Sequence, residues 1–177
     1  MKPYEMRDKQ YKMLCFLSSL PRKIMGLQGI DNVTEFVLHD LCHEDCFNLK
    51  RAAYFVDNAD FNCTKGVAGY SRQEAYANPH SIWEDPQAFS EHMHNSPFNS
   101  KVRSLSRCSL KKDGDLHAEL AGDLAADLGF SNYGFCTWRA RHDNDGFVVY
   151  EKAVADETFD DDYIVNGLTL LSFCPMH

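Results

Sequence analysis

Apolar residues recur at helical spacing in three parts of the chain, and each part predicts a helix. The first part covers residues 6–27, where Pro21 interrupts the pattern. Because proline is tolerated in the first turn of a helix but not inside one, we expect a helix ending near residues 17–19 and a second short helix or turn from Pro21. A second helix is expected over residues 31–48. The strongest pattern covers residues 115–128, with leucine at every fourth position.

Short runs rich in aromatic and β-branched residues predict strands in two further parts of the chain. Residues 51–56 and 63–70 flank turn-forming residues and therefore predict a β-hairpin. Residues 133–141 and 147–152 flank an Asp-Gly turn and predict a second hairpin. Because neither hairpin would be stable alone, we expect both to belong to one antiparallel sheet.

The remaining segments complete an α+β order of elements. Residues 71–114 are rich in Pro, Ser and Asn, which favours loops and short helices, and one helix is expected over residues 86–94. A capping box formed by Thr158 and Asp161 predicts a closing helix. The predicted fold class is therefore α+β: an antiparallel sheet built from two β-hairpins, flanked by helices, with an N-terminal helix.

Length and composition indicate one globular domain. The chain has 177 residues, of which 44% are hydrophobic and 25% charged, as in ordinary folded domains. We therefore expect residues 1–29 to form an N-terminal helical segment and residues 30–177 to form a single α+β domain.

Charge and cysteine content bear on the class of function. The net charge of −8 argues against direct binding of nucleic acid or of an anionic membrane, since both depend on clustered Lys and Arg. No apolar run approaches the ~20 residues of a membrane-spanning helix. Seven cysteines, an odd number scattered along the chain, fit free thiols in a reducing compartment better than a disulfide framework. We expect a cytoplasmic protein without a membrane partner.

Three segments between residues 32 and 173 carry a resemblance to a known family: RAAYFVDNADFNCTKGVAGYS, LAADLGFSNYGFCTWRARHDNDGFVVYEK and TFDDDYIVNGLTLLSF. With the helix before them they resemble the hairpins and helices of a GAF-type sensory domain, which is related to PAS-like folds. The part LGFSNYGFCTWR also resembles the autoinducer-binding domain of quorum-sensing regulators, which has a similar α/β/α layering. The chain departs from the GAF pattern in its His- and Pro-rich middle. The resemblance implies a small-molecule pocket between sheet and helices, usually in a dimer.

Several aromatic side chains are candidates for lining such a pocket, because ligand sites often combine aromatic residues with a few polar groups. Ordinary core packing is the alternative explanation for them, and a concavity that their rings face would distinguish the two. The candidate ligand-binding residues are Tyr54, Tyr70, Trp83, Tyr133, Phe135 and Trp138.

Histidines and cysteines gather on one face of the helix expected over residues 31–48. At ~100° per residue, His39, Cys42, His43 and Cys46 fall within about 100° of arc. The two histidines are four residues apart and could bind one metal ion, with further ligands from elsewhere in the chain. The alternative is a helix face that packs on the N-terminal helix or on another subunit.

No motif in the sequence requires a cofactor. A transition metal at His39 and His43, or haem at the Cys174-Pro175 dipeptide, is the alternative. Cys108 lies among basic residues, which could make its thiol reactive.

The function expected from these observations is that of a sensory or small-ligand-binding domain without catalysis, which couples pocket occupancy to a dimer or to a separate output protein. The alternative is a small metal- or thiol-dependent enzyme that uses His39 and His43 with cysteines or further histidines. We expect a homodimer formed through the N-terminal helix, unless the apolar stripe of that helix packs on its own domain instead. The stripe consists of Met6, Met13, Leu17, Leu20, Ile24 and Leu27.

Overall fold

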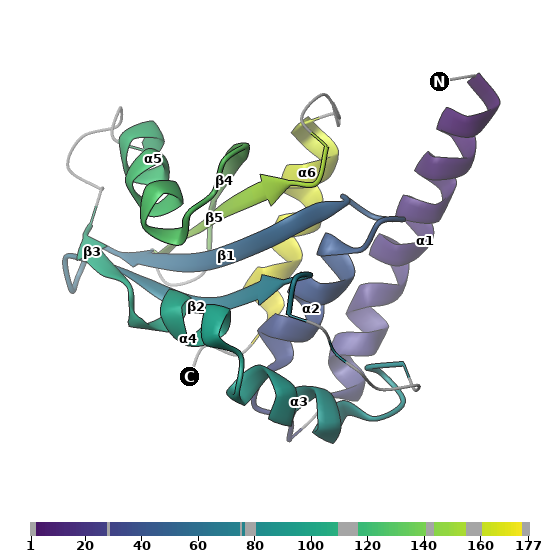
Figure 1. Ribbon diagram of the computed structural model, residues 1–177, viewed down its shortest axis with the longest axis horizontal. Coiled ribbons are helices and arrows are strands. Elements are labelled where there is room, and N and C mark those ends of the chain that lie inside the picture. The colour runs from purple at the N-terminus through teal and green to yellow at the C-terminus, as the bar shows by residue number, and fades with distance from the viewer. Residues whose placement is uncertain are drawn as a thin grey trace.

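Helices cover both faces of one antiparallel sheet in the computed structural model of this chain (Figure 1). The structure describes residues 3–27, 29–74, 76, 81–109, 117–140, 144–154 and 161–174. The helices are α1 (Pro3–Gly26), α2 (Val33–Cys42), α3 (Pro86–His94), α4 (Pro97–Ser104), α5 (His117–Leu128), α6 (Asp161–Leu168) and the short 3-10 helix η1 (Thr169–Phe173). The strands are β1 (Leu49–Asn58), β2 (Cys63–Ser71), β3 (Ser106–Cys108), β4 (Tyr133–Arg139) and β5 (Asn144–Lys152).

The five strands are arranged in the order β3-β2-β1-β5-β4. Strand β1 pairs antiparallel with β2 on one side and with β5 on the other, so the two hairpins share one sheet, as predicted. The α+β class with helices on both sides is also confirmed. Strand β3 was not expected, because three polar residues carry no hydrophobic alternation; it pairs with the first residues of β2.

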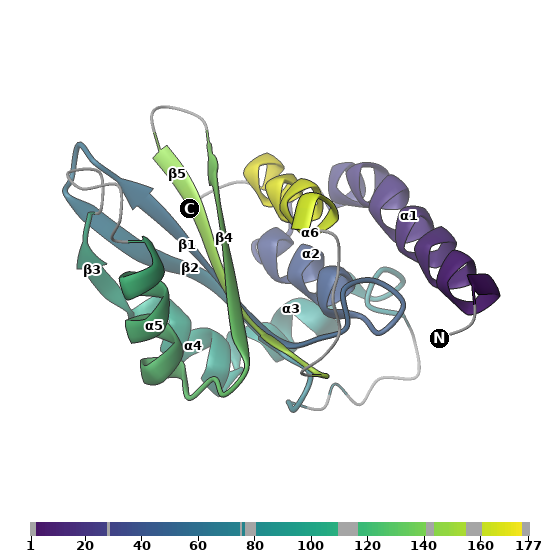
Figure 2. The same ribbon diagram turned by 90° about the horizontal axis from the view of Figure 1, so that it is seen from above.

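One face of the sheet is covered by α2, α3 and α6, and α1 forms a further layer outside them (Figure 2). Met13, Leu20 and Leu27 are buried in the core that this layer shares with α2 and η1. Leu17 and Ile24 of the same stripe are partly buried against this core, so the described part of the stripe packs on its own domain. This packing is the alternative considered for the stripe, and the homodimer through the N-terminal helix stays a prediction.

The opposite face of the sheet is covered by α4 and α5 (Figure 2). Leu120, Leu124 and Leu128 are buried there against a cluster that includes Phe147 and Val149 of β5. The helix predicted over residues 115–128 is thus confirmed from His117 onward, and its first two residues lie outside the described part of the chain.

Two predictions about helix boundaries were wrong. Helix α1 runs without a break through Pro21, because Leu20 before the proline and Leu27 after it are buried in the same core, while Pro21 itself is exposed. Helix α2 ends at Cys42 rather than near Asn48. His43 already has an extended backbone, and Asn48 adopts a φ of 47° that no helix allows. Cys46 is therefore not on the helix.

The helix expected over residues 86–94 is confirmed as α3, and the expected closing helix is confirmed as α6. Thr158, the proposed cap of the closing helix, lies outside the described residues. Among the helices that the structure describes, none is both long enough and apolar enough to cross a membrane.

Candidate functional site

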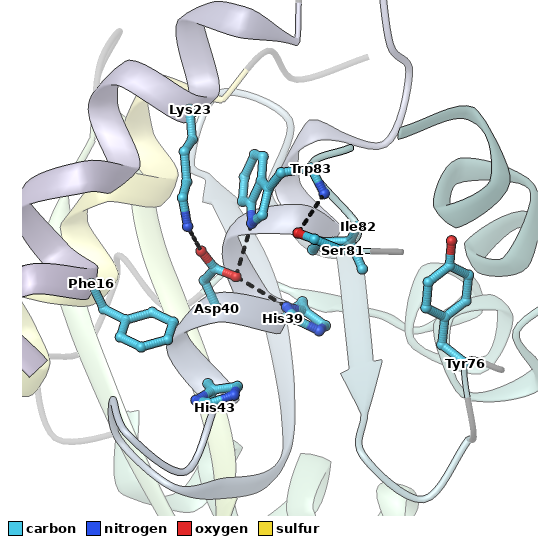
Figure 3. A pocket seen from close by; sticks show the side chains of 9 residues that line it. All are labelled: Phe16, Lys23, His39, Asp40, His43, Tyr76, Ser81, Ile82 and Trp83. Atoms are coloured by element: carbon cyan, nitrogen blue, oxygen red, sulfur yellow. Dashed lines mark hydrogen bonds and ion pairs between the residues drawn. The ribbon is translucent and has the colours of Figure 1, made fainter. Parts of the chain in front are cut away.

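A pocket of about 340 Å³ opens where α1, α2 and the turn before α3 meet (Figure 3). Aromatic rings form much of its wall, and charged or titratable groups of α1 and α2 lie among them. Its lining residues are Phe16, Lys23, His39, Asp40, His43, Tyr76, Ser81, Ile82 and Trp83.

Asp40 is the centre of the polar network in this pocket. Its side chain is only 3% exposed, although it belongs to the mostly apolar helix α2. Lys23 Nζ of α1 lies 2.7 Å from Asp40 Oδ2. The other oxygen, Oδ1, accepts hydrogen bonds from the indole N–H of Trp83 (3.2 Å) and from His39 Nδ1 (3.1 Å). Figure 3 shows these three donors converging on the carboxylate, which ties α1, α2 and the turn before α3 together.

The charge of Asp40 is stabilised by these donors. Burial alone would raise the pKa of the carboxyl group, because it disfavours the charged form. Hydrogen bonds from His39 and Lys23, together with the positive charge of Lys23, outweigh burial and hold the pKa of Asp40 below its ordinary value. The network therefore contains an ionised carboxylate at neutral pH.

This lowered pKa predicts a pH dependence of stability. A group that binds its proton less tightly in the folded state stabilises the fold above its ordinary pKa of ~4, and this contribution is lost as the pH falls through the folded value. We expect Asp40→Asn to cost about 1 to 2 kcal/mol near neutral pH, measured by urea unfolding. The difference in free energy of unfolding between this variant and wild type should become smaller below about pH 4.

The control for this prediction is Asp45→Asn, which removes the exposed Lys12–Asp45 ion pair. Because exposed pairs contribute little, this change should cost less than about 0.5 kcal/mol. A difference between wild type and Asp40→Asn that stays constant from pH 7 to pH 3 would contradict the role given to the Asp40 charge.

The two histidines of the pocket present different groups to a ligand. His39 donates Nδ1–H to Asp40, which leaves Nε2 of the neutral ring as an acceptor. His43 Nδ1 instead accepts the backbone N–H of Asp45 at 3.2 Å, so the neutral ring carries its proton on Nε2. The His43 ring also stacks on Phe16, with a centroid distance of 4.9 Å.

Aromatic rings surround the cation of the pocket. Lys23 Nζ lies 4.7 Å from the ring centroid of Trp83 and 5.6 Å from that of Phe16. Both distances are within the range of cation–π attraction. Lys23 is thus positioned by two rings as well as by Asp40, with a flat apolar surface on either side.

Only one of the six aromatic residues predicted to bind a ligand lines this pocket, and it is Trp83. Tyr70 lies next to it in the core, where its ring contacts the edge of the His39 ring at 5.2 Å. Tyr70 therefore supports a pocket residue from behind rather than lining the pocket.

The other four predicted aromatic residues lie elsewhere on the sheet. Tyr54 and Trp138 stack on each other at 5.7 Å, and the indole N–H of Trp138 donates to Ser172 Oγ. Phe135 packs in the cluster on the opposite face of the sheet. Tyr133 is 44% exposed. Core packing accounts for Tyr54, Phe135 and Trp138, the alternative considered from the sequence.

His39 and His43 both line the pocket, together with Asp40. Within the described residues, no group of three or more His, Cys, Asp or Glu side chains could hold a metal ion. Burial raises the pKa of the Cys42 thiol and raises that of Cys46 to about 12. It also raises the pKa of the Cys174 thiol to about 12. All three thiols are therefore protonated at neutral pH.

Sequence reasoning missed Asp40 and Lys23, which organise the site. A signal was present for Asp40, since it stands in the apolar helical segment VTEFVLHDLC, where a carboxylate must be buried and needs a partner. The partner could not be identified, because Lys23 is one of several basic residues in the first segment of the chain.

His39 also has the hydrogen bonding of an acid–base group. The Asp40–His39 pair would leave His39 Nε2 able to accept a proton, as in many acid–base sites. Ser81 Oγ, a hydroxyl in the pocket lining, accepts a hydrogen bond from the backbone N–H of Trp83 at 3.3 Å.

Comparison with known proteins does not assign a family. No family model matches the chain, and no curated protein is significantly similar to it. The function is therefore inferred from the residues of the pocket.

Proposed function

We propose that this chain is a sensory domain that binds a small planar molecule in the pocket between α1 and α2, without catalysis. The ligand carries a carboxylate or another hydrogen-bond acceptor. The observation that carries this proposal is the Asp40 network, in which a buried carboxylate fixes Lys23 and Trp83 at the pocket wall.

The pocket has the size and the walls of a small-molecule site. Its volume of about 340 Å³ falls at the lower end of the ~300–1,000 Å³ typical of such sites. Phe16 and Trp83 offer flat apolar surfaces on either side of Lys23. These surfaces favour a planar aromatic ring, since aromatic rings prefer offset or edge-to-face contact with other rings.

Hydrogen-bonding groups of the pocket favour an acceptor on the ligand. Asp40 is the acidic side chain of the lining, and both of its oxygens already accept bonds from the protein. Lys23 carries three N–H donors, of which one is directed at Asp40. His43 adds a donor at Nε2 in its neutral form. A ligand carboxylate would meet the remaining N–H groups of Lys23 and the Nε2–H of His43, while the negative charge of Asp40 is already paired with Lys23.

Helix α1 is the element through which we propose that occupancy is transmitted. It contributes Phe16 and Lys23 to the pocket and lies outermost in the fold (Figure 2). A ligand that contacts both residues would bias the position of α1 against α2. A second copy of the chain or a separate output protein would then bind differently according to the position of α1. We place this activity in the cytoplasm, where the free thiols of the chain would persist.

The proposal is tested by nuclear magnetic resonance with indole-3-carboxylate as the probe and indole-3-carboxamide as its uncharged analogue. The two tryptophans, Trp83 and Trp138, give two separate indole N–H signals. We expect the carboxylate to shift the Trp83 signal saturably, because this indole lines the pocket. The Trp138 signal should move little, because its ring is buried in the core.

Two lysine variants show whether the charge in the pocket is responsible. Lys23→Met should weaken binding of the carboxylate by about tenfold or more, since it removes a charge-assisted contact. Lys12→Met is the matched control, because Lys12 lies on the same helix and pairs with Asp45 outside the pocket. Equal binding by both variants, or no saturable shift of Trp83 with the carboxylate, would refute the proposal.

A further inference from the structure

Two cysteines face each other across the edge of the sheet. Cys63 is the first residue of β2 and Cys108 is the last residue of β3, and the two are direct partners in the antiparallel ladder. Both are free thiols. Strand β3 is only three residues long and forms the edge of the sheet.

The ladder determines the type of this pair. The N–H of Gly66 donates to the carbonyl oxygen of Leu105 at 3.0 Å, which is one of the two bonds of a hydrogen-bonded position in the same register; the N–H of Leu105 donates to Val102 instead. Hydrogen-bonded and non-hydrogen-bonded pairs alternate along an antiparallel ladder. Cys63 and Cys108 are three positions farther along and therefore form a non-hydrogen-bonded pair, in which the Cα atoms lie ~4.5 Å apart. Disulfides have Cα separations of ~4.4–6.8 Å.

The two thiols are also accessible and directed to the same side. Cys63 Sγ lies 3.1 Å from Ser106 Oγ. Ser106 is two residues before Cys108 on β3, so the two side chains lie on the same face of the sheet. The side chains of Cys63 and Cys108 therefore share that face. Cys108 is exposed and Cys63 is partly exposed. Cys42, Cys46 and Cys174, in contrast, are buried.

We propose that Cys63 and Cys108 form a reversible intramolecular disulfide when the protein meets a low-molecular-weight disulfide such as oxidised glutathione. One thiolate attacks the small disulfide, forms a mixed disulfide and releases one glutathione thiolate. The second cysteine then attacks the mixed disulfide at the protein sulfur and releases the second glutathione. Two protein thiols are oxidised, and one glutathione disulfide is reduced to two thiols.

The disulfide would connect two distant parts of the chain. Residues 64–107, which lie between the cysteines, include α3, α4 and the turn with Trp83 that forms one wall of the pocket. Closing a loop of this length restricts the unfolded chain and stabilises the fold. Oxidation would therefore fix the short strand β3 on β2, whether or not the pocket binds a ligand.

The test uses the full-length reduced protein, incubated with mixtures of reduced and oxidised glutathione and then blocked with iodoacetamide. Trypsin cleavage places Cys63 alone in peptide 52–65 and Cys108 alone in peptide 108–111. Mass spectrometry should find these two peptides linked, with a mass lower than their sum by two hydrogens. The linkage should disappear when dithiothreitol is added.

Cysteine variants identify the bond. Cys63→Ser and Cys108→Ser should each abolish the linked peptides and leave the remaining cysteine with a glutathione adduct. Cys15→Ser, at an exposed position on α1, should leave the linkage unchanged. If wild-type protein carries only separate glutathione adducts on Cys63 and Cys108, the proposal is wrong.

Thermal unfolding gives an independent measurement. Oxidised wild type should melt at a temperature roughly 5 °C or more above the reduced protein. This difference should vanish in both single-serine variants. An unchanged melting temperature in protein that carries the linkage would show that the bond forms without stabilising the sheet edge, and the proposed tie between β3 and β2 would then be rejected.

Discussion

Replacing Gly66 by alanine should destabilise the protein by about 3 kcal/mol or more. A Cβ atom at this position would lie 1.9 Å from the carbonyl oxygen of Val102 in α4. This contact is with backbone, so no side chain can rotate to relieve it, and either α4 or β2 must shift. Urea unfolding followed by circular dichroism measures the change.

Gly26→Ala is the matched control for this substitution. A Cβ atom at Gly26, the last residue of α1, has no neighbour within 4 Å. Because alanine has the higher helix propensity, this variant should be as stable as wild type or more stable by up to about 1 kcal/mol. If both variants unfold at the same urea concentration, α4 does not lie against β2 at the distance described.

Leu124→Ala should cost about 2 to 5 kcal/mol, because it leaves a cavity in a closely packed core. Leu124 is 0% exposed in the cluster between α5 and the sheet. The same change at Leu14, which is 51% exposed on α1, should cost less than about 0.5 kcal/mol. Denaturant unfolding of both variants compares them directly. A loss below about 0.5 kcal/mol at Leu124 would mean that the leucine face of α5 is exposed.

The parts of the fold that were predictable from sequence are those in which local pattern and tertiary burial agree. The leucines of α5 repeat every four residues and a glycine follows them, so the helix and its end were both predictable. In the structure Gly129 has a φ of 69°. Both hairpins carry strand-forming runs around recognisable turns. The shared sheet was predictable because neither hairpin would be stable alone, whereas the strands through which the hairpins meet, β1 and β5, were not predicted.

The parts that were missed depend on contacts between distant residues. Pro21 is tolerated because buried side chains on both sides of it hold α1 together, which no local rule reveals. Strand β3 has no pattern of its own and exists because β2 offers it a partner. The pocket was missed in the same way, since Lys23 and Trp83 meet at Asp40 only after folding.

The close approach of α4 to β2 also protects one side of the sheet from aggregation. Strand β3 pairs only with the first residues of β2. Beyond them, side chains of α4 form hydrogen bonds with the backbone of β2. The N–H of Gly69 donates to Asn99 Oδ1 at 2.8 Å, and the carbonyl oxygen of Val67 accepts from Arg103 Nε at 3.0 Å. An edge strand with unpaired groups can pair with a strand of another molecule. Here side chains of α4 form hydrogen bonds with the backbone groups of Gly69 and Val67. Addition of a strand from another molecule at this edge would therefore first require α4 to detach from β2.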